Sequence, residues 1–348
     1  MTQVWTIPVH DSTRVRDARV AAEEASAHAR LDAQRTAVAA LVATELATNL
    51  LKHADGGRLL IDIDDRPGTG DRGTSVQLAA LDHGPGILDV VLAMRDGYTT
   101  SEASLGAGLG TCLRISSAFD LYSTPRGTVA VARVDQRAGQ EETRSAVSAG
   151  GINIPFAQAE HSGDAWSCAR SGSRSTLMLA DGLGHGAKAA QASSTAVDEL
   201  HRVAHLPAAE ILRHLHTALR PTRGAAVAVA QVDTDNGELD FAGVGNIGAR
   251  LHTAGSWQHL ISHPGIVGAH YPAAVPVRRL PWRPGSLLVL HSDGLPSRWA
   301  PPDDADLLVH APAAIAATIL RDASSAASPV RDDTCVAVLT SDRPVRRP

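Results

Sequence analysis

The chain has 348 residues and a formal net charge of −5, with 32 basic and 37 acidic side chains. This length predicts two domains, each able to bury its own core. The well-mixed charges leave no basic stripe for nucleic acid or an anionic membrane, so we expect neither as a partner. No apolar run is long enough to span a bilayer, and the three widely spaced cysteines favour neither a disulfide framework nor a zinc site. We expect a cytoplasmic protein.

The first third of the chain predicts a domain of mixed helices and strands. An apolar strand at 4–9 precedes two helical patterns at about 13–30 and 34–53, and strands at 58–63 and 75–81 follow.

Glu45 and Asn49 stand four residues apart in the second helical pattern, beside an apolar stripe that would face a sheet. Their side chains therefore lie one turn apart on one helix face. Such a carboxylate can orient or deprotonate a nucleophile, and an amide oxygen can bind magnesium. A solvated helix face would show the same pattern.

Two glycine-rich segments follow this helix. Asp82 ends an apolar strand and opens the first segment, where it could accept a hydrogen bond from an adenine amino group. The second segment precedes the apolar run 112–115, which suits a loop whose helix amides hold phosphate. The glycines are Gly84 and Gly86 in the first segment and Gly106, Gly108 and Gly110 in the second. Each segment alone could be an ordinary turn or connector, but their order and spacing favour a nucleotide site.

Residues 1–136 resemble the GHKL ATPase fold, a Bergerat-type α/β sandwich, and more narrowly the RsbT and RsbW group of bacterial serine kinases. The resemblance rests on ELATNLLKHADGG (45–57), LDHGPGILDVVLAMRDGYTTSEASLGAGLG (81–110) and RGTVAVARV (126–134). It implies ATP with Mg²⁺ as cofactor, Glu45 as catalytic base, Asn49 as magnesium ligand and Asp82 as the residue that reads adenine. It also implies that Gly84, Gly86, Gly106, Gly108 and Gly110 form the nucleotide lid and its hinges.

Residues 137–150 predict a linker, because the stretch DQRAGQEETRSAVSAGG (135–151) is polar and small with no sustained apolar period. Beyond it, short strands dominate, interrupted by one helix after Gly186 and one over 208–219. Tight turns such as Asp235-Asn-Gly237 predict a mostly antiparallel α+β domain. The expected strands are 175–179, 225–232, 239–244, 249–252, 286–291 and 334–340.

Three aspartates of this second domain stand at the ends of apolar strands. Asp181 follows 177–180, Asp293 follows the strand ending near 291, and Asp332 precedes the last strand. Hard oxygen ligands select magnesium or manganese, and a two-metal site needs carboxylates from separate strands. One Asp-Gly alone would be an ordinary turn, but three strand-end aspartates indicate a metal centre.

Residues 151–342 resemble the SpoIIE-type, RsbX-like branch of the PPM serine/threonine phosphatases. The motifs are HSGDAW (161–166), ADGLGHGAKAA (180–190), GVGNIGARL (243–251), HSDGL (291–295) and RDDTCVAVL (331–339). The resemblance implies a β-sandwich flanked by helices and two Mn²⁺ or Mg²⁺ ions that activate water for attack on phosphorus. The implied ligands are Asp181, which would bridge the metals, Asp293, Asp332, the backbone of Gly182, and Asp164 directly or through water.

Three histidines and one cysteine have simpler explanations than catalysis. Cys168 is not followed by the glycines of a phosphate-binding loop, which a cysteine nucleophile would need, so we expect it to be a small buried residue. His185 could protonate the leaving serine oxygen or cap the helix that starts near Gly186, and we favour the cap. His53 and His291 are expected to be hydrogen-bonded neighbours.

These observations predict a bifunctional regulator of bacterial partner switching in stress or sigma-factor signalling. It would phosphorylate and dephosphorylate serine or threonine on a STAS-domain antagonist or scaffold protein, or act within a sigma-regulatory complex. Two alternatives stay open. The first domain could bind ATP and sequester a partner without phosphoryl transfer, or the chain could be a metabolic phosphatase for small phosphoesters with a fused ATP-sensing domain.

Overall fold

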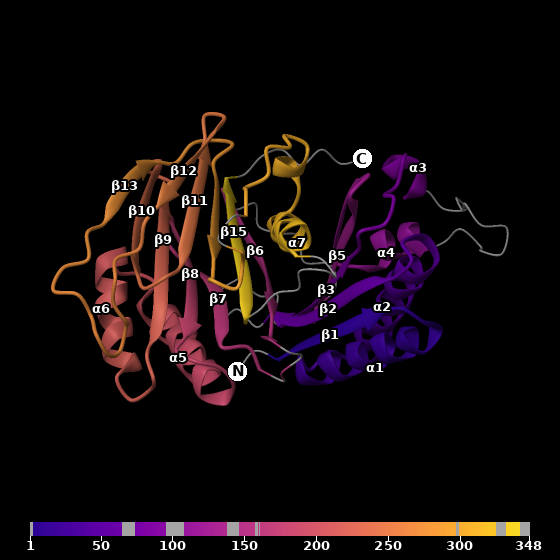
Figure 1. The fold of residues 1–348 in the computed structure, drawn as a ribbon, viewed down its shortest axis with the longest axis horizontal. Helices are drawn as coiled ribbons and strands as arrows, with labels where there is room; N and C mark the ends of the chain where they lie inside the picture. The colour runs from indigo at the N-terminus through magenta and orange to yellow at the C-terminus, as the bar shows by residue number, and fades with distance from the viewer. Residues whose placement is uncertain are drawn as a thin grey trace. The chain divides into compact units, whose positions relative to one another are not determined.

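The computed structural model describes residues 3–64, 74–94, 108–137, 146–156, 159, 161–296, 299–324 and 332–341. The chain divides into two compact units, one built from the described residues between 4 and 137 and one from those between 146 and 341 (Figure 1). None of the described helices is long and apolar enough to cross a membrane.

The N-terminal unit is a five-stranded antiparallel sheet with two long helices on one face (Figure 1). In sheet order the strands are β1 (Val4–Val9), β2 (Gly57–Asp64), β3 (Ser75–Leu81), β5 (Gly127–Asp135) and β4 (Ala118–Thr124). The helices are α1 (Ser12–His28), α2 (Ala33–His53), the short α3 (Val90–Ala93) and α4 (Gly108–Ile115). The expected α/β sandwich is confirmed.

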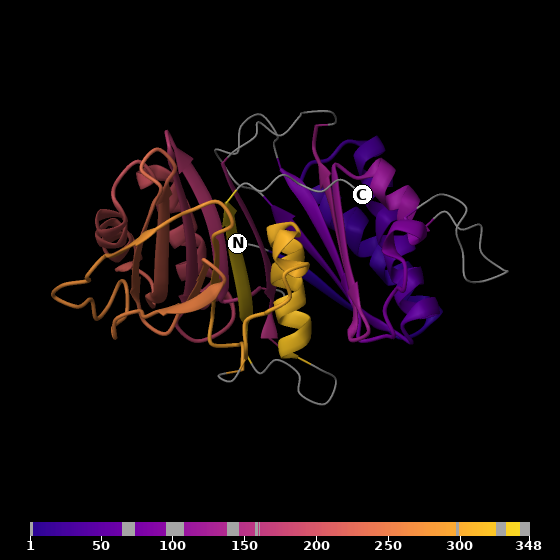
Figure 2. The ribbon, with the colours of Figure 1, turned by 90° about the horizontal axis from the view of Figure 1, so that it is seen from above.

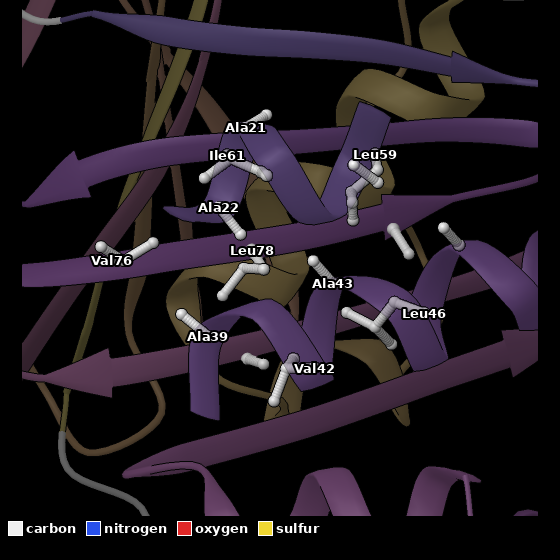
Figure 3. Close-up of a cluster of buried hydrophobic side chains, with 14 of the residues drawn as sticks. Ala21, Ala22, Ala39, Val42, Ala43, Leu46, Leu59, Ile61, Val76 and Leu78 are labelled. Atoms are coloured by element: carbon white, nitrogen blue, oxygen red, sulfur yellow. The ribbon is translucent and has the colours of Figure 1, made fainter. Parts of the chain in front are cut away.

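The core of this unit lies between the sheet and helices α1 and α2 (Figure 3). Because strand side chains alternate between faces, Leu59 and Ile61 of β2 reach the same core, and Leu78 of β3 joins them. The helices present small residues such as Ala22 and Ala43, which are fully buried and let the backbones approach closely.

Helix α2 begins at a side-chain cap and ends at a glycine. The Asp32 carboxylate accepts a 2.7 Å hydrogen bond from the Arg35 amide, and the Gly56 amide donates to the Leu50 carbonyl at 3.0 Å. Gly56 has a φ of +107°, a backbone conformation that favours glycine. The buried stripe of α2 faces the sheet, which leaves Glu45 and Asn49 half-buried at its edge.

The C-terminal unit consists of two five-stranded antiparallel sheets packed face to face, with helices outside them (Figures 1 and 2). The first sheet runs β13 (Arg278–Pro281), β10 (Glu238–Val244), β9 (Ala225–Asp233), β8 (Arg174–Gly182) and β7 (Asp164–Ser171). The second runs β12 (Ser256–Leu260), β11 (Gly248–Thr253), β14 (Leu287–His291), β15 (Thr334–Ser341) and β6 (Val147–Ile154).

Helices α5 (Ala187–Val203) and α6 (Ala208–Leu219) cover the first sheet, and α7 (Pro312–Ala323) packs on β6 and β15 of the second. Strand β8 is apolar on both faces for this reason. Leu177 and Leu179 point into the sandwich, while Met178 and Ala180 lie in the core beneath α5 and α6. The expected β-sandwich flanked by helices is confirmed.

Two elements differ from the sequence-based expectation. Strand β6 begins at Val147, inside the predicted linker 137–150, and pairs with β15 along its whole length. Its small residues serve close packing, since a Cβ on Gly150 would lie 2.5 Å from the Ala313 amide nitrogen and one on Gly151 would lie 2.6 Å from the Trp166 ring. The small residues of β6 are needed for this close packing, but their composition resembles that of a linker, so the sequence-based prediction was wrong here. Helix α7 was also not expected.

Candidate functional site

The acidic residues of the C-terminal unit gather where β7 begins and β8 ends. In the antiparallel register Asp164 pairs with Asp181, and Asp181 pairs on its other side with Ala226 of β9. Gly182 completes this end of β8, and its amide donates a 3.0 Å hydrogen bond to the Gly163 carbonyl.

The second sheet brings its own aspartates to a shared turn. Asp293 lies two residues after β14, and Asp332 and Asp333 immediately precede β15. The two segments touch because a Cβ on Gly294 would lie only 2.2 Å from the Asp333 carbonyl oxygen. Glycine at this position therefore places Asp293 beside the start of β15.

The carboxylates affect one another electrostatically. Asp164 is 2% exposed, and neither of its carboxylate oxygens accepts a hydrogen bond of ordinary geometry from the described residues. Burial raises the pKa of Asp164 well above its usual range, and the charge of Asp181 raises it further. Burial and then Asp293 raise the pKa of Asp181 to about 7, and burial and then Asp332 raise the pKa of Asp293. Such mutual repulsion in a partly buried cluster is typical of a functional site.

The donor set fits hard divalent cations such as Mg²⁺ and Mn²⁺, because it consists of carboxylate oxygens, of which those on Asp164 are buried and unsatisfied. As they stand, no three acidic, histidine or cysteine side chains of the described residues enclose an ion. Two of the carboxylates are engaged by internal donors instead. Asp293 accepts a 2.7 Å hydrogen bond from the Asn246 amide, and Asp333 accepts from the backbone amides of Phe156 and Gly163 at 2.7 and 2.8 Å.

Gly182, predicted to bind metal through its backbone, also has a packing role. A Cβ at this position would lie 2.1 Å from the Ala189 carbonyl oxygen in the first turns of α5. The glycine lets α5 approach the end of β8, so the aspartate loop and the helix are held together. Its metal role stays a prediction.

Asp333 stands beside Asp332 in the carboxylate pattern of the sequence but was not predicted as a metal ligand, and Asn246 was not predicted as a site residue. Asp333 is 6% exposed, its charge raises the pKa of both Asp164 and Asp181, and its hydrogen bond to Gly163 holds the entry to β7. Asn246 orients Asp293. Asp333 lies in the motif RDDT and Asn246 in the motif GVGNIG, and both motifs were recognised in the sequence. The local sequence does not show that either segment lies next to Asp164, Asp181 or Asp293.

The structure tests the simpler explanations for His291, Cys168 and His185. His291 donates from Nδ1 to the Ser292 carbonyl and accepts at Nε2 from the Trp299 indole, which confirms it as a hydrogen-bonded neighbour. Cys168 is buried in the sandwich core as expected. The preferred role of His185 as a helix cap is wrong. The N-cap of α5 is Gly186 with no side-chain cap, because its φ of +75° turns the chain there and leaves His185 exposed.

The N-terminal unit brings Glu45, Asn49 and Gly108 together. A Cβ on Gly108 would lie 3.0 Å from Glu45 Oε2 and 3.5 Å from Asn49 Oδ1. The Asn49 side-chain nitrogen is buried without a hydrogen-bond partner in the described part of the chain. The helical end of the second glycine-rich segment thus lies against the predicted base and magnesium ligand, and Gly110 is buried two residues further along α4. Gly106 lies outside the described residues.

Asp82 directly follows β3. It is 7% exposed, and its Oδ1 accepts hydrogen bonds from the amides of Gly84 and Thr128, each at 2.9 Å. Thr128 was not predicted, although it follows the Arg-Gly turn between β4 and β5.

Gly84 and Gly86 permit close backbone approaches. A Cβ on Gly84 would lie 2.8 Å from Ala54, just past α2, and one on Gly86 would lie 2.1 Å from the Thr124 carbonyl oxygen. These contacts join the Asp82 segment to α2 and β4. The lid role of the glycines stays a prediction.

Comparisons with known proteins agree with this two-part organisation. Residues 9–134 match the family model of the histidine kinase-like ATPase domain, and residues 171–342 match that of stage II sporulation protein E (SpoIIE).

Two curated proteins of Bacillus subtilis (strain 168) are similar to parts of the chain. Serine/threonine-protein kinase RsbT is 40% identical over 81 residues, which is 23% of this chain and 56% of RsbT. Phosphoserine phosphatase RsbX is 25% identical over 118 residues, which is 34% of this chain and 59% of RsbX. The chain therefore spans less than two thirds of each relative.

A solved structure described as "The bacterial stressosome: a modular system that has been adapted to control secondary messenger signaling" contains a similar chain. The match has a TM-score of 0.50 and 26% identity, and it covers 56% of this chain and 98% of that one. Together with the family models and the geometry above, these relatives show what the two units are. The chain joins an ATPase domain of the histidine kinase-like family to a PPM-type phosphatase domain of the SpoIIE family.

Proposed function

We propose that the C-terminal domain removes phosphate from phosphoserine or phosphothreonine of a protein, using two Mn²⁺ or Mg²⁺ ions. The observation that supports this most is the pairing of Asp164 with Asp181 at one end of the sandwich, with Asp293 and Asp332 within electrostatic range. A fold that buries mutually repelling carboxylates is suited to binding divalent cations.

The proposed ligands are the side chains of Asp181, Asp293 and Asp332, the Gly182 carbonyl, and Asp164 directly or through water. When bound, the metal pair would supply a water of lowered pKa and neutralise the phosphoryl oxygens. The chain's residues hold this arrangement in place. Asn246 orients Asp293, and Asp333 holds the backbone of Gly163 next to Asp164. No side-chain nucleophile is required.

The test is release of phosphate from a serine-phosphorylated protein of the STAS type by the full chain with Mn²⁺. Asp181→Asn should lower the rate about a hundredfold or more, because it removes a charge that the metals require. Asp198→Asn, an exposed aspartate of α5, is the matched control and should remain active. An active Asp181→Asn variant would contradict the metal assignment. Faster turnover of small phosphoesters than of any phosphoprotein would favour a metabolic phosphatase.

We further propose that the N-terminal domain is a serine kinase for the same STAS-type antagonist or scaffold protein. Glu45 would act as base and Asn49 would bind the Mg²⁺ of ATP. Asp82 would accept a hydrogen bond from the adenine amino group. The contact of Gly108 with Glu45 and Asn49 supports this role, because the glycine-rich segment would then hold the phosphates of ATP beside the base that takes the proton from the acceptor hydroxyl. The similarity to RsbT, a serine/threonine-protein kinase, supports it independently.

Labelling of the partner with Mg²⁺ and radioactive ATP tests the kinase. Glu45→Gln should abolish labelling while ATP binding and phosphate release persist, since the two sites lie in different domains. Asp181→Asn should leave labelling intact. Nucleotide-dependent partner binding without any labelling by the wild-type chain would favour the alternative in which the N-terminal domain only sequesters its partner.

A further inference from the structure

Arg223 stands at the same end of the first sheet as the aspartates. It lies two residues before β9, and in the β8–β9 register Ala225 pairs with Gly182 and Ala226 with Asp181. The segment that carries Arg223 therefore emerges beside the end of β8, on the side opposite Asp164.

The guanidinium of Arg223 lies across the loop that follows Asp181. A Cβ on Gly184 would lie 2.9 Å from Arg223 Nη1, and apart from the adjacent residues no other heavy atom of the described part of the chain lies within 4 Å of that position. The Leu183 amide also donates a 3.0 Å hydrogen bond to the Gly224 carbonyl, so both backbone and side chain join the two segments. Gly184 leaves the space that the guanidinium occupies.

The backbone on both sides of Arg223 is held in a defined turn. Thr222 Oγ1 donates to the Leu219 carbonyl at 2.7 Å and accepts from the Gly224 amide at 3.0 Å. Gly224 has a φ of +83°, which directs the chain into β9. A fixed backbone limits where the arginine side chain can reach.

The same loop contacts the acidic cluster. A Cβ on Gly163 would lie 3.5 Å from the Gly184 carbonyl oxygen and 2.9 Å from Asp333 Oδ2. The loop that Arg223 contacts therefore lies against Gly163, whose amide donates a hydrogen bond to Asp333.

Charge pairing distinguishes Arg223 from Arg202 and Arg279 of the same domain. Arg202 pairs with Glu199 and Arg279 with Asp240, whereas no carboxylate of the described residues lies within ion-pairing distance of Arg223. The side chain is exposed, so its donors are available to a ligand. A planar guanidinium can bind two oxygens of a phosphate group at once, and this geometry suits a dianionic phosphate monoester.

We propose that Arg223 binds the phosphoryl oxygens of the substrate and thereby sets the affinity of the phosphatase for phosphate monoesters. This inference rests on the proposed phosphatase function. It predicts that the arginine acts on the phosphoryl group itself, so that peptide and small-molecule substrates depend on it equally.

The test compares Arg223→Ala and Arg223→Lys with the wild-type chain, each loaded with Mn²⁺. Arg220→Ala, an exposed arginine at the end of α6, is the matched control. Hydrolysis of p-nitrophenyl phosphate and of a phosphoserine peptide gives kcat and KM, and calorimetric titration gives the Kd of inorganic phosphate. Arg223→Ala should raise both KM values and the phosphate Kd about tenfold, which corresponds to about 1.4 kcal/mol, with a smaller change in kcat. For Arg223→Lys, the KM values and the phosphate Kd should lie between those of Arg223→Ala and the wild type. For Arg220→Ala, they should equal those of the wild type.

An unchanged phosphate Kd in Arg223→Ala would overturn the inference, and so would a rise in KM for the peptide alone, which would place the arginine on the peptide. A parallel loss of Mn²⁺ affinity or of Tm would mark it as structural and would also overturn it. Failure of the wild-type chain to hydrolyse any phosphate monoester would instead contradict the proposed function. In that case the phosphate titration still decides whether Arg223 forms an anion site.

Discussion

Asp164 on β7 lies directly opposite Asp181 on β8, so two carboxylates face each other across neighbouring antiparallel strands. Like charges directly opposite each other destabilise a sheet. Both oxygens of Asp164 are buried without a hydrogen bond of ordinary geometry from the described residues, which adds a desolvation cost. The pair therefore lowers the stability of the metal-free domain at the site where we propose that cations bind.

Replacing one member of this pair should stabilise the metal-free protein. Asp164→Asn keeps the shape, replaces a carboxyl that must either be buried as a charge or take up a proton on folding, and lets an amide donate to Asp181. With EDTA, the C-terminal domain should gain about 1 kcal/mol, or a Tm higher by about 2–4 °C. With Mn²⁺ the wild type should be the more stable of the two proteins, because the bound ion stabilises it more than it stabilises the variant. Thermal unfolding in both buffers measures this, and a variant that loses stability in EDTA would contradict the repulsion.

His291 should make the C-terminal domain sensitive to acid. Its hydrogen bonds to Ser292 and Trp299 require the neutral ring, and burial lowers its pKa from 6.5 to about 4. Above pH 6.5 the folded and unfolded states are both neutral. Between pH 6.5 and 4 only the unfolded chain takes up the proton, so stability is lost as the pH falls, by at most about 3 kcal/mol.

His291→Gln cannot titrate and should show a flatter dependence of unfolding free energy on pH over this window, even though it is less stable at pH 7. Urea unfolding at pH 7, 6 and 5 provides the comparison. Parallel curves for the two proteins would show that another group controls the acid response.

Gly182→Ala should destabilise the C-terminal domain. The added methyl group would lie 2.1 Å from the Ala189 carbonyl oxygen, so α5 must shift away from the end of β8. We expect a loss of about 1–3 kcal/mol together with loss of phosphatase activity. Gly172→Asn, in the hairpin at the other end of β8, has no neighbour within 4 Å and a φ of +58° that asparagine tolerates, so it serves as control. Equal Tm values for Gly182→Ala and the wild type would contradict the close approach.

The three cysteines should resist thiol reagents while the chain is folded. All three are buried, and burial followed by the charge of Glu45 raises the pKa of Cys112 to about 12. The thiolate is the reactive form, so little of it exists at pH 8. Titration with a chromogenic disulfide should find almost no rapid reaction in buffer and reaction of all three thiols in guanidinium chloride. Rapid reaction of one thiol in buffer would show that its surroundings open.

The sequence alone determined the features that depend on local pattern. Apolar periodicity predicted helix α2 and its Glu45–Asn49 pair, and the strand ends before Asp181 and Asp293 followed from the length of each apolar run. Motif order was sufficient to recognise both families. Composition misled at β6, where small residues required by packing were taken for a linker.

Only the tertiary structure decided which distant residues meet. The register that sets Asp164 opposite Asp181, the hydrogen bond from Asn246 to Asp293, and the approach of Arg223 to Gly184 all join segments separated along the chain. Such contacts arise from the packing of whole strands and helices, so they cannot be predicted from the residues that flank a position in the sequence. Periodicity can therefore place a side chain at the end of a strand, whereas its partner across the site depends on how the sheets assemble.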